Sequence, residues 1–288
     1  MKKDSQREGI LYICGTPIGN LKDITLRALN TLREVDLIAA EDTRRTKNLL
    51  NHYQINTPVT SYYEHNKLKK APYLIVKIKE GKRVALVSDA GMPGISDPGY
   101  LLINLALQNN IQIIPVPGVS ALVTALVISG LPSNRFVFEG FLPRKNVEEK
   151  RYLAKIKDEK RTLVFYEAPH RLKKTLKNML EEWGDRKMVM ARELTKKYEE
   201  ILRGKISQIL EEAGKREIRG EITLVVEGQS EEKEKNNFIK KGETLEEFLK
   251  ELKLGEYSNK EIIKITQEKL NIPKKVIYKK LLEMKNDV

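Results

Sequence analysis

The sequence predicts an α/β protein with two α/β domains, followed by a small helical module at the C-terminal end. Short apolar runs alternate with amphipathic stretches through about the first 130 residues, as in a mostly parallel sheet covered by helices. The alternation then continues with more charged helices and with strands that suit a mixed or antiparallel sheet. The last part of the chain shows helical periodicity alone.

We assign residues 8–132 to the first domain. Its predicted strands are short apolar runs, and its predicted helices carry apolar residues at three- and four-residue spacing. In chain order, the predicted strands are ILYICG (10–15), DLIAAED (36–42), RVALVSD (83–89) and IQIIPVPG (111–118). The predicted helices are TLRALNTLREV (25–35), TRRTKNLLNHY (43–53), GYLLINLALQNN (99–110) and SALVTALVISG (120–130).

The second domain is assigned to residues 133–229 by the same patterns. Its predicted strands are TLVFYEAP (162–169), KMVMARELT (187–195) and GEITLVVEG (220–228). Its predicted helices are VEEKRYLAKIKDEKR (147–161), HRLKKTLKNMLEEWG (170–184) and GKISQILEEAGK (204–215). Residues 230–243 form a polar stretch without apolar periodicity, which indicates a linker. Residues 244–288 form the helical tail.

The composition narrows the class of protein. The 288 residues include 53 Lys and Arg against 40 Asp and Glu, a net charge of +13. This excess favours a polyanionic partner such as nucleic acid, although interleaved charges on a solvated surface explain it equally well. Cys14 is the single cysteine, and the three histidines show no metal-ligand spacing, so we expect neither a disulfide nor a metal site. We recognise no signal peptide or membrane span and expect a cytoplasmic protein.

Three loops rich in glycine and proline follow three of the predicted strands. They are Gly15–Leu21, Asp89–Gly99 and Pro115–Ser120. None of them matches the nucleotide-triphosphate loop or the G-x-G-x-x-G pattern. In an open α/β sheet, ligands bind at the carboxyl ends of the strands, so the three loops are suited to line one crevice. Three tight turns without a ligand remain the alternative.

Eight motifs then occur in order along the chain: GTPIGNLKDIT, EDTRRTKNLL, SDAGMPGISDPG, PVPGVSALVTAL, EGFLPRK, FYEAPHRL, ARELTKKYEE and GEITLVVEG. Together they closely resemble the tetrapyrrole-methylase-like superfamily of S-adenosylmethionine methyltransferases, also known as class III. EDTRRT and YEAPHR resemble the branch that methylates a cytidine 2′-oxygen of 16S rRNA. The resemblance covers residues 10–228 approximately. It implies two α/β domains with the cofactor in the cleft between them, a homodimer, and a target in the decoding region of the small ribosomal subunit, cytidine 1402.

The resemblance also implies which residues contact S-adenosylmethionine. The sequence departs from the family pattern at Met92, where a small polar residue is expected, and at Val119, where proline is expected. Asp89 is also suited to the role of a turn carboxylate, and Ser120 to the N-cap of the next helix. The implied cofactor residues are Pro17, Asp89, Gly91, Met92, Gly94, Ser120, Ala121, Tyr166, Ala168, Ile222 and Thr223.

Methyl transfer from a sulfonium needs no metal, but it needs donor and acceptor to be aligned. A ribose hydroxyl is a poor nucleophile, so a base that accepts its proton would help the reaction. The candidate bases are Asp42, Glu64, His65 and Lys196, and Glu41 and Glu193 are further carboxylates suited to this role. Alternatively, Asp42 begins a helix, His65 lies on the surface, and Lys196 pairs with a nearby glutamate.

Cations near the predicted cleft are candidates for holding the RNA. They are Arg44 and Arg45, which follow Asp42, and Arg192, which is equally suited to an ion pair with a neighbouring glutamate.

In the tail, Ser258 is a good N-cap for a helix that carries Ile262, Ile263 and Leu270, and Pro273 marks a turn. We expect Val276, Ile277 and Leu281 of the following helix to face the first one.

The tail is strongly basic between residues 269 and 285, with six lysines against one glutamate. Lys274 and Lys275 are therefore candidate RNA contacts, and the module is a candidate clamp on RNA phosphates. A dimer contact fits the same pattern.

Two other functions share the resemblance: a methylase of a small tetrapyrrole, and a non-catalytic ribosome-assembly factor that binds RNA. The basic surface favours RNA over a porphyrinoid, and binding of S-adenosylmethionine distinguishes the enzyme from the factor.

Overall fold

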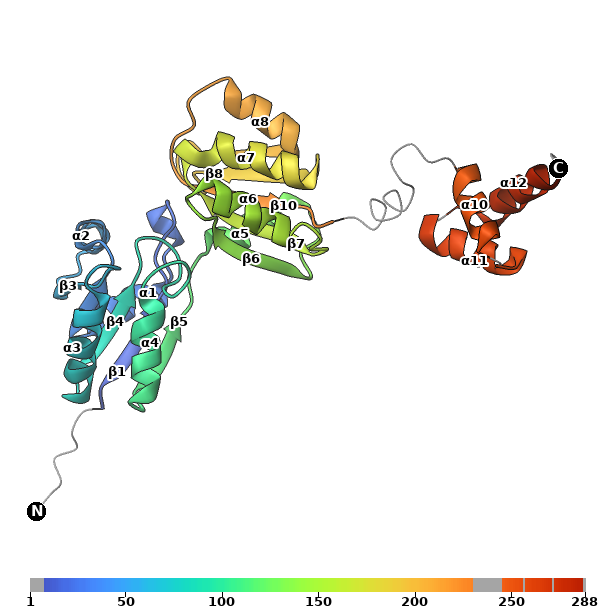
Figure 1. Ribbon diagram of the computed structural model, residues 1–288. Helices are drawn as coiled ribbons and strands as arrows, with labels where there is room; N and C mark the ends of the chain where they lie inside the picture. Colours follow the sequence, from blue (N-terminus) through green and yellow to red (C-terminus); the bar gives the residue numbers. More distant parts are fainter. Residues whose placement is uncertain (1–7, 230–244, 256, 271, 287–288) are drawn as a thin grey trace, which may run out of the picture. The chain divides into compact units, whose positions relative to one another are not determined.

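The computed structural model describes residues 8–229, 245–255, 257–270 and 272–286. The chain forms two compact units, of which one holds both α/β sheets and the other holds the C-terminal helices (Figure 1). Among the residues that the structure describes, none of the helices is long and apolar enough to span a bilayer. The predicted linker, residues 230–243, lies outside the described residues.

The first sheet has five parallel strands in the order β3-β2-β4-β1-β5. The strands are β1 (Ile10–Cys14), β2 (Leu37–Ala40), β3 (Val59–Ser61), β4 (Arg83–Val87) and β5 (Gln112–Val116). The helices between them are η1 (Leu21–Asp23), α1 (Leu26–Glu34), α2 (Thr43–His52), α3 (Lys67–Lys79) and α4 (Gly99–Gln108). Because all five strands are parallel, their carboxyl ends and the loops that follow them lie at one edge of the sheet.

Helices cover both faces of this sheet. Helices α1 and α2 pack on one face through side chains such as Leu32 and Leu50, and α3 and α4 pack on the other through Leu74 and Leu102. The helix α1, which connects β1 to β2, lies on the first face of the sheet. The helix α4, which connects the neighbouring strand β4 to β5, lies on the second face. The switch point of this doubly wound sheet therefore lies between β1 and β4, where ligands bind in such folds.

The second sheet is mixed, as expected from its closely spaced strands. Its order is β6-β7-β10-β8-β9, with β6 and β7 parallel and the remaining pairs antiparallel. The strands are β6 (Phe136–Phe141), β7 (Thr162–Glu167), β8 (Lys187–Arg192), β9 (Glu200–Lys205) and β10 (Ile222–Val226). Helices α6 (Asn146–Lys155), α7 (Pro169–Trp183) and α8 (Ile206–Gly214) pack on one face.

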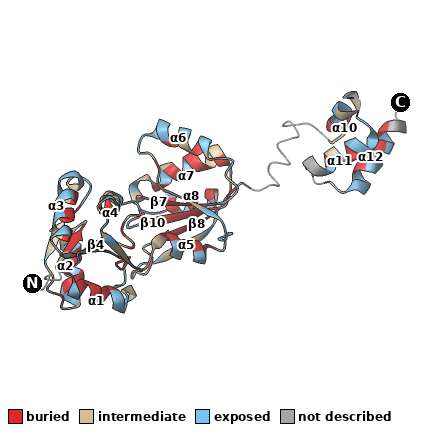
Figure 2. Cartoon of the chain, turned by 90° about the horizontal axis from the view of Figure 1, so that it is seen from below, coloured by how far each residue is buried: buried red, intermediate tan, exposed pale blue. Residues whose placement is uncertain are grey.

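The opposite face of the second sheet is covered by α5 (Ala121–Ser129). Leu122, Ala125 and Leu126 of this helix pack against Val164 and Val225 of the sheet. We assigned α5 to the first domain, but its buried face belongs to the core of the second sheet. With helices on both faces, β10 is buried along its whole length, and Figure 2 shows the buried residues gathered on the central strands.

The C-terminal unit consists of α10 (Leu245–Leu254), α11 (Asn259–Leu270) and α12 (Lys274–Asn286). Its core holds Leu249, Ile262, Ile263, Ile277, Leu281 and Met284. Ser258 caps α11 as predicted, because its hydroxyl accepts from the Glu261 N–H and the Glu261 carboxylate accepts from the Ser258 N–H. Val276 was expected to face α11, but it is 50 % exposed. The side chain of Leu270 lies outside the described residues.

Candidate active site

The three predicted loops meet at the carboxyl edge of the first sheet. Thr16 and Gly91 exchange two backbone hydrogen bonds of 2.9 and 3.0 Å, which join the loop after β1 to the loop after β4. The loop after β5 touches the loop after β1 through two glycines, since a Cβ on Gly15 would lie 2.7 Å from the Cα of Gly118. Side chains at these two positions would force the loops apart.

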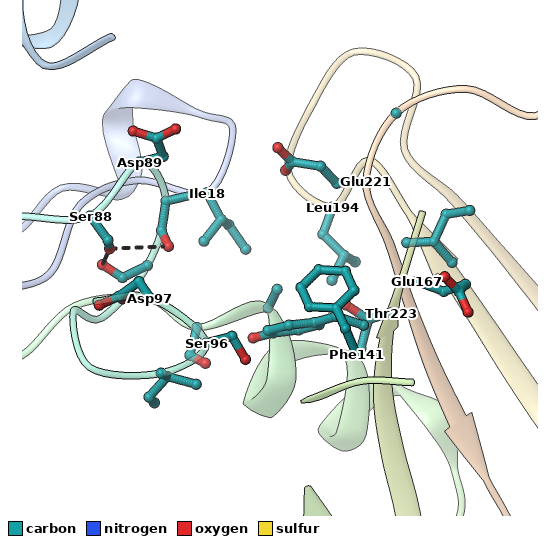
Figure 3. A pocket seen from close by; sticks show the side chains of 18 of the residues that line it. Ile18, Ser88, Asp89, Ser96, Asp97, Phe141, Glu167, Leu194, Glu221 and Thr223 are labelled. Carbon is teal, nitrogen blue, oxygen red and sulfur yellow. Dashed lines mark hydrogen bonds between the residues drawn. The ribbon is translucent and has the colours of Figure 1, made fainter. Parts of the chain in front are cut away.

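These loops form one wall of a cavity of about 430 Å³, and the second sheet forms the other wall. Figure 3 shows Ile18, Asp89 and Asp97 on the side of the first sheet, and Phe141, Leu194 and Thr223 on the side of the second. The volume falls within the roughly 300–1,000 Å³ of small-molecule sites. Nine of the eleven implied cofactor residues line the cavity: Asp89, Gly91, Met92, Ser120, Ala121, Tyr166, Ala168, Ile222 and Thr223.

The other two implied cofactor residues lie elsewhere. Pro17 lines a second, adjoining cavity, and Gly94 lines neither of the two. The N–H of Gly94 donates to the Asp97 carboxylate at 2.8 Å, and the N–H of Gly91 donates to the Thr16 carbonyl at 3.0 Å. Both donors are used within the loops, so these glycines shape the wall and cannot donate to a ligand without breaking those bonds.

The N-terminus of α5 opens at the cavity. Ser120 takes the N-cap position with an extended backbone, yet its side chain makes no capping bond in the described structure. Ser120 and Ala121 both line the cavity, so the positive end of the helix dipole faces a ligand. Ser120 therefore begins the helix through its backbone and lines the cavity, while its side chain is a hydrogen-bond partner of Tyr166 rather than a cap.

An aromatic cluster forms part of the opposite wall. The ring of Tyr166 lies 5.0 Å from that of Phe138 and 5.7 Å from that of Phe141, measured between centroids. Burial raises the pKa of Tyr166, although hydrogen bonds from the Leu122 backbone and the Ser120 side chain oppose this. A neutral aromatic surface of this kind suits a flat, apolar group such as a nucleobase.

The wall on the side of the first sheet is acidic. The Asp89 carboxylate accepts from the Asp42 N–H at 2.8 Å, and the Glu41 carboxylate accepts from the Asp89 N–H at 3.2 Å. Asp89 thus joins the end of β2 to the loop after β4, rather than bonding within its own turn, and it also lines the cavity. Burial raises the pKa of Glu41, with further contributions from the negative charges of Asp89 and Asp97 and opposition from the Asp89 N–H. A perturbed carboxyl group in a cleft is a candidate for proton transfer.

The candidate bases are dispersed. Asp42 caps α2 and accepts from the Arg44 N–H at 2.8 Å, and hydrogen bonds from the Arg44 side chain and backbone lower the pKa of Asp42 to about 2. Such a carboxylate accepts a proton poorly. Glu64 pairs with Lys67, and neither Glu64 nor His65 lines the first cavity or the adjoining second one.

Lys196 lies at the second cavity rather than the first. Its Nζ is 2.8 Å from Glu193 and 3.2 Å from Glu221. Burial acts to lower the pKa of Lys196, but the ion pairs with Glu193 and Glu221 outweigh burial and raise it. Lys196 therefore stays protonated and provides a positive charge, which makes it a poor base.

The three predicted RNA-binding arginines of the α/β unit differ in exposure. Arg45 lines both cavities and is 59 % exposed, 3.6 Å from Asp89. Arg44 is 89 % exposed, outside both cavities, and pairs with Asp42. Arg192 is only 14 % exposed, pairs with Glu200 at 2.9 Å and donates to a backbone carbonyl. The ion pair that the sequence left open for Arg192 is therefore the one that the structure contains.

The first four residues of the motif YEAPHR line the first cavity, and its charged side chains also hold neighbouring segments in place. Glu167 is buried, accepts from Thr175 Oγ1 at 2.7 Å, and lies 3.5 Å from Arg171. Arg171 also donates to the carbonyl of Pro143, which fixes the loop after β6. Within the described ranges, no group of three or more His, Cys, Asp or Glu side chains is arranged to hold a metal ion.

Several lining residues were not predicted. Most of them lie one or two positions from residues that the motifs singled out, so adjacency was the available signal. Phe141 and Glu221 lie within the motifs EGFLPRK and GEITLVVEG but carried no spacing signal of their own. The additional residues of the first cavity are Ile18, Ser88, Ala90, Ile95, Ser96, Asp97, Phe141, Glu167, Pro169, Ala191, Leu194, Gly220 and Glu221.

A doubly wound parallel sheet, a mixed second sheet and a cavity walled by both define an α/β protein with a small-molecule site between its two sheets. The family model for tetrapyrrole (corrin/porphyrin) methylases matches residues 10–210, and the chain belongs to this family. A solved uroporphyrin-III C-methyltransferase from Thermus thermophilus, complexed with S-adenyl homocysteine, has a TM-score of 0.54 at 18% identity and covers 76% of this chain and 97% of its own. Diphthine synthase reaches a TM-score of 0.60 at 15% identity, over 77% of this chain and 90% of its own.

Curated relatives of much higher identity carry one name, ribosomal RNA small subunit methyltransferase I. The relative from Halalkalibacterium halodurans is 48% identical over 94% of this chain and 94% of its own length. That from Bacillus subtilis is 46% identical over 94% of this chain and 93% of its own. The relative from Thermotoga maritima is 53% identical, and the match covers 99% of it but only 77% of this chain. Almost the whole of that relative is therefore matched, whereas about a quarter of the present chain has no counterpart in it.

Proposed function

We propose that this protein is an S-adenosylmethionine-dependent rRNA methyltransferase that methylates the 2′-hydroxyl of a cytidine in the decoding region of 16S rRNA, cytidine 1402. The observation that carries the proposal is the cavity of about 430 Å³, which is lined by nine of the eleven implied cofactor residues. The curated relatives support rRNA as the substrate class. A substrate of this kind implies a cytoplasmic enzyme.

The residues present fit the cofactor. The aromatic rings of Phe141 and Tyr166 offer a surface for the adenine, and the carboxylates of Asp89 and Asp97 suit a cationic ligand. The N-terminus of α5 suits the carboxylate of the methionine moiety. When bound, S-adenosylmethionine supplies a methyl group on a positively charged sulfur.

The chain's own residues then have two tasks. The loops after β1, β4 and β5 hold donor and acceptor in line, which is the larger part of catalysis in such a displacement. Methylation of a hydroxyl also releases its proton, and Glu41 is the candidate best suited to accept it. Glu41 lines the cavity with a raised pKa, whereas the pKa of Asp42 is lowered and Lys196 stays charged.

The remaining partners are also part of the proposal. The exposed lysines Lys274 and Lys275 begin α12, which supports contact between the C-terminal unit and RNA phosphates. Exposed apolar side chains on α3 and α4, such as Leu68 and Tyr100, support a homodimer. Sedimentation of the full chain at micromolar concentration measures this directly, with a dimer mass as the expected result.

The test of the function is methyl transfer from labelled S-adenosylmethionine to small ribosomal subunits that lack the modification. Free 16S rRNA serves as the second substrate, which distinguishes an enzyme that needs the assembled subunit from one that acts on RNA alone. Label in the rRNA of either substrate is the expected result. Cofactor binding without transfer to either substrate would contradict the proposal.

A further inference from the structure

A second cavity of about 270 Å³ adjoins the first, and its role is not explained by cofactor binding. It lies among the loop after β1, the first half of α2 and the loop between β8 and β9. Six residues line both cavities, so the two spaces meet: Ile18, Arg45, Ser88, Asp89, Ala90 and Glu221. A ligand in the second cavity would therefore reach the edge of the first.

The loop between β8 and β9 has a strained backbone at this cavity. Glu193 and Thr195 have φ values of 51° and 65°, in the left-handed region that a β-branched residue such as threonine rarely adopts. Hydrogen bonds hold the strained loop in place, since Asn20 N–H donates to Thr195 Oγ1 at 3.0 Å and Glu221 N–H donates to the Glu193 carboxylate at 2.9 Å. Strain of this kind is maintained where it positions a functional group.

Lys196 is the group that this loop positions. A Cβ on Gly19 would collide with the Lys196 side chain, so the loop after β1 passes close against it. The Lys196 Nζ lies 3.2 Å from Glu221, and the guanidinium of Arg45 lies 3.9 Å from the other oxygen of the same carboxylate. Two cations from opposite sides of the junction thus share one carboxylate.

Glu221 is poorly suited to be a permanent partner for these cations. Its side chain is 57 % exposed, and an exposed ion pair contributes little to stability. An RNA phosphodiester carries the same single negative charge and the same two free oxygens as a carboxylate, so it can pair with the same cations. The carboxylate of Glu221 therefore marks the position that an incoming phosphate is able to take.

The rest of the lining suits the remainder of a nucleotide. Pro17, Leu21 and Leu49 provide apolar surface for a base, and Thr46 and Asn48 provide polar groups for its edge. The volume is too small for paired strands. We propose that the second cavity is the acceptor subsite, which takes one unpaired nucleotide of the RNA, with Arg45 and Lys196 on its phosphate in place of Glu221. This rests on the proposed function, and it places the ribose where the two cavities meet.

Lys196→Ala is the decisive variant, because Lys196 lines only the second cavity. Lys197→Ala is the matched control, since it removes the same charge from a neighbouring side chain outside both cavities. We expect Lys196→Ala to weaken binding of unmodified small subunits by about 10- to 100-fold, the effect of one charge-assisted hydrogen bond. The slope of log affinity against log salt should fall by about 0.7–0.9, and Lys197→Ala should change neither value. The affinity for S-adenosylmethionine, measured by calorimetry, should stay unchanged in both.

Two further variants keep the test decisive if Lys196→Ala is poorly folded. Asn48→Trp fills the cavity from an exposed position on α2 and should raise KM for subunits without loss of cofactor affinity. Glu221→Gln should tighten RNA binding, because it removes the competing carboxylate. If the wild type methylates subunits but Lys196→Ala and Asn48→Trp behave like Lys197→Ala, the subsite is wrong and the proposed function stands. A wild type that methylates neither rRNA substrate overturns the proposed function itself.

Discussion

Gly15→Ala tests how the cofactor cavity is built. Gly15 directly follows the strand β1, and its N–H donates to the Val116 carbonyl at 3.0 Å. An added Cβ would lie 2.7 Å from the Cα of Gly118, 2.8 Å from its N and 2.7 Å from the Sδ of Met92. The Met92 side chain is able to move aside, but the backbone of Gly118 has no room to do so while Gly15 remains bonded to Val116.

The size of the effect follows from these contacts. Relief requires the loops after β1 and β5 to separate, and overpacking of this kind costs about 1–3 kcal/mol. For a unit of this size, each kcal/mol lowers Tm by about 2–4 °C. Because Ser120 and Ala121 follow Gly118 so closely, the N-terminus of α5 moves with it. We expect the affinity for S-adenosylmethionine to fall by about tenfold or more, since each 1.4 kcal/mol corresponds to roughly a factor of ten.

The assay combines thermal unfolding with calorimetric titration of S-adenosylmethionine. Gly214→Ala is the matched control, because a Cβ there meets nothing within 4 Å and the residue lies at the end of α8. In a helix this substitution raises stability by about 0.5–1 kcal/mol. The reasoning is refuted if Gly15→Ala matches the wild type in both Tm and cofactor affinity.

Three further predictions concern the roles of individual groups. Glu41→Gln should lower kcat by about 10²- to 10⁴-fold with little change in cofactor affinity, and an unchanged kcat would exclude Glu41 as the base. Because the raised pKa of Glu41 leaves its carboxyl group protonated at low pH, wild-type kcat should rise with pH through that pKa, and the variant should lose this rise. Asp42→Ala should lower Tm and leave kcat unchanged, whereas Asp42→Asn should keep the wild-type Tm because asparagine also caps helices. A loss of kcat in both variants would make Asp42 a candidate base again. Deletion from Gly242 onward should weaken rRNA binding and spare cofactor binding, because it removes the helical unit whose exposed lysines begin α12; equal rRNA affinity would argue against the clamp.

The sequence predicts the buried strands well and the edge strands poorly. The strands β1, β2, β4, β5, β7, β8 and β10 all lie where apolar runs placed them. Of the four edge strands, β5 was predicted, whereas β3, β6 and β9 were not. An edge strand is covered less completely, as in β9, whose residues are half-buried or exposed, so its apolar signal is weak.

The candidate site divides in a similar way. Motif positions such as Asp89, Ser120 and Tyr166 line the cavity, because the resemblance extends to the loops that form it. The bonding state of individual groups was not visible in the sequence. The Gly94 N–H is used by Asp97, and Arg192 is held by Glu200, because each partner comes from a turn or a strand pairing that only the fold determines.

The junction of the two cavities shows the same limit more sharply. Lys196, Arg45 and Glu221 are far apart in the chain and are brought together by α2, the loop after β8 and the start of β10. Motif order indicated that each segment matters, but not that one carboxylate is shared by two cations. The strained backbone at Thr195 was equally hidden, because threonine is not a residue type that indicates a left-handed conformation.

The central claim is that one chain binds S-adenosylmethionine in its cavity and places its methyl group on a ribose of 16S rRNA. The most direct test is mass spectrometry of nucleosides from unmodified small subunits that were incubated with the protein and isotopically labelled S-adenosylmethionine. We predict labelled 2′-O-methylcytidine from a single position in the decoding region, and about tenfold less of it or lower with Gly15→Ala at limiting cofactor. Label on a base, on another nucleoside, or on no nucleoside at all would contradict the account.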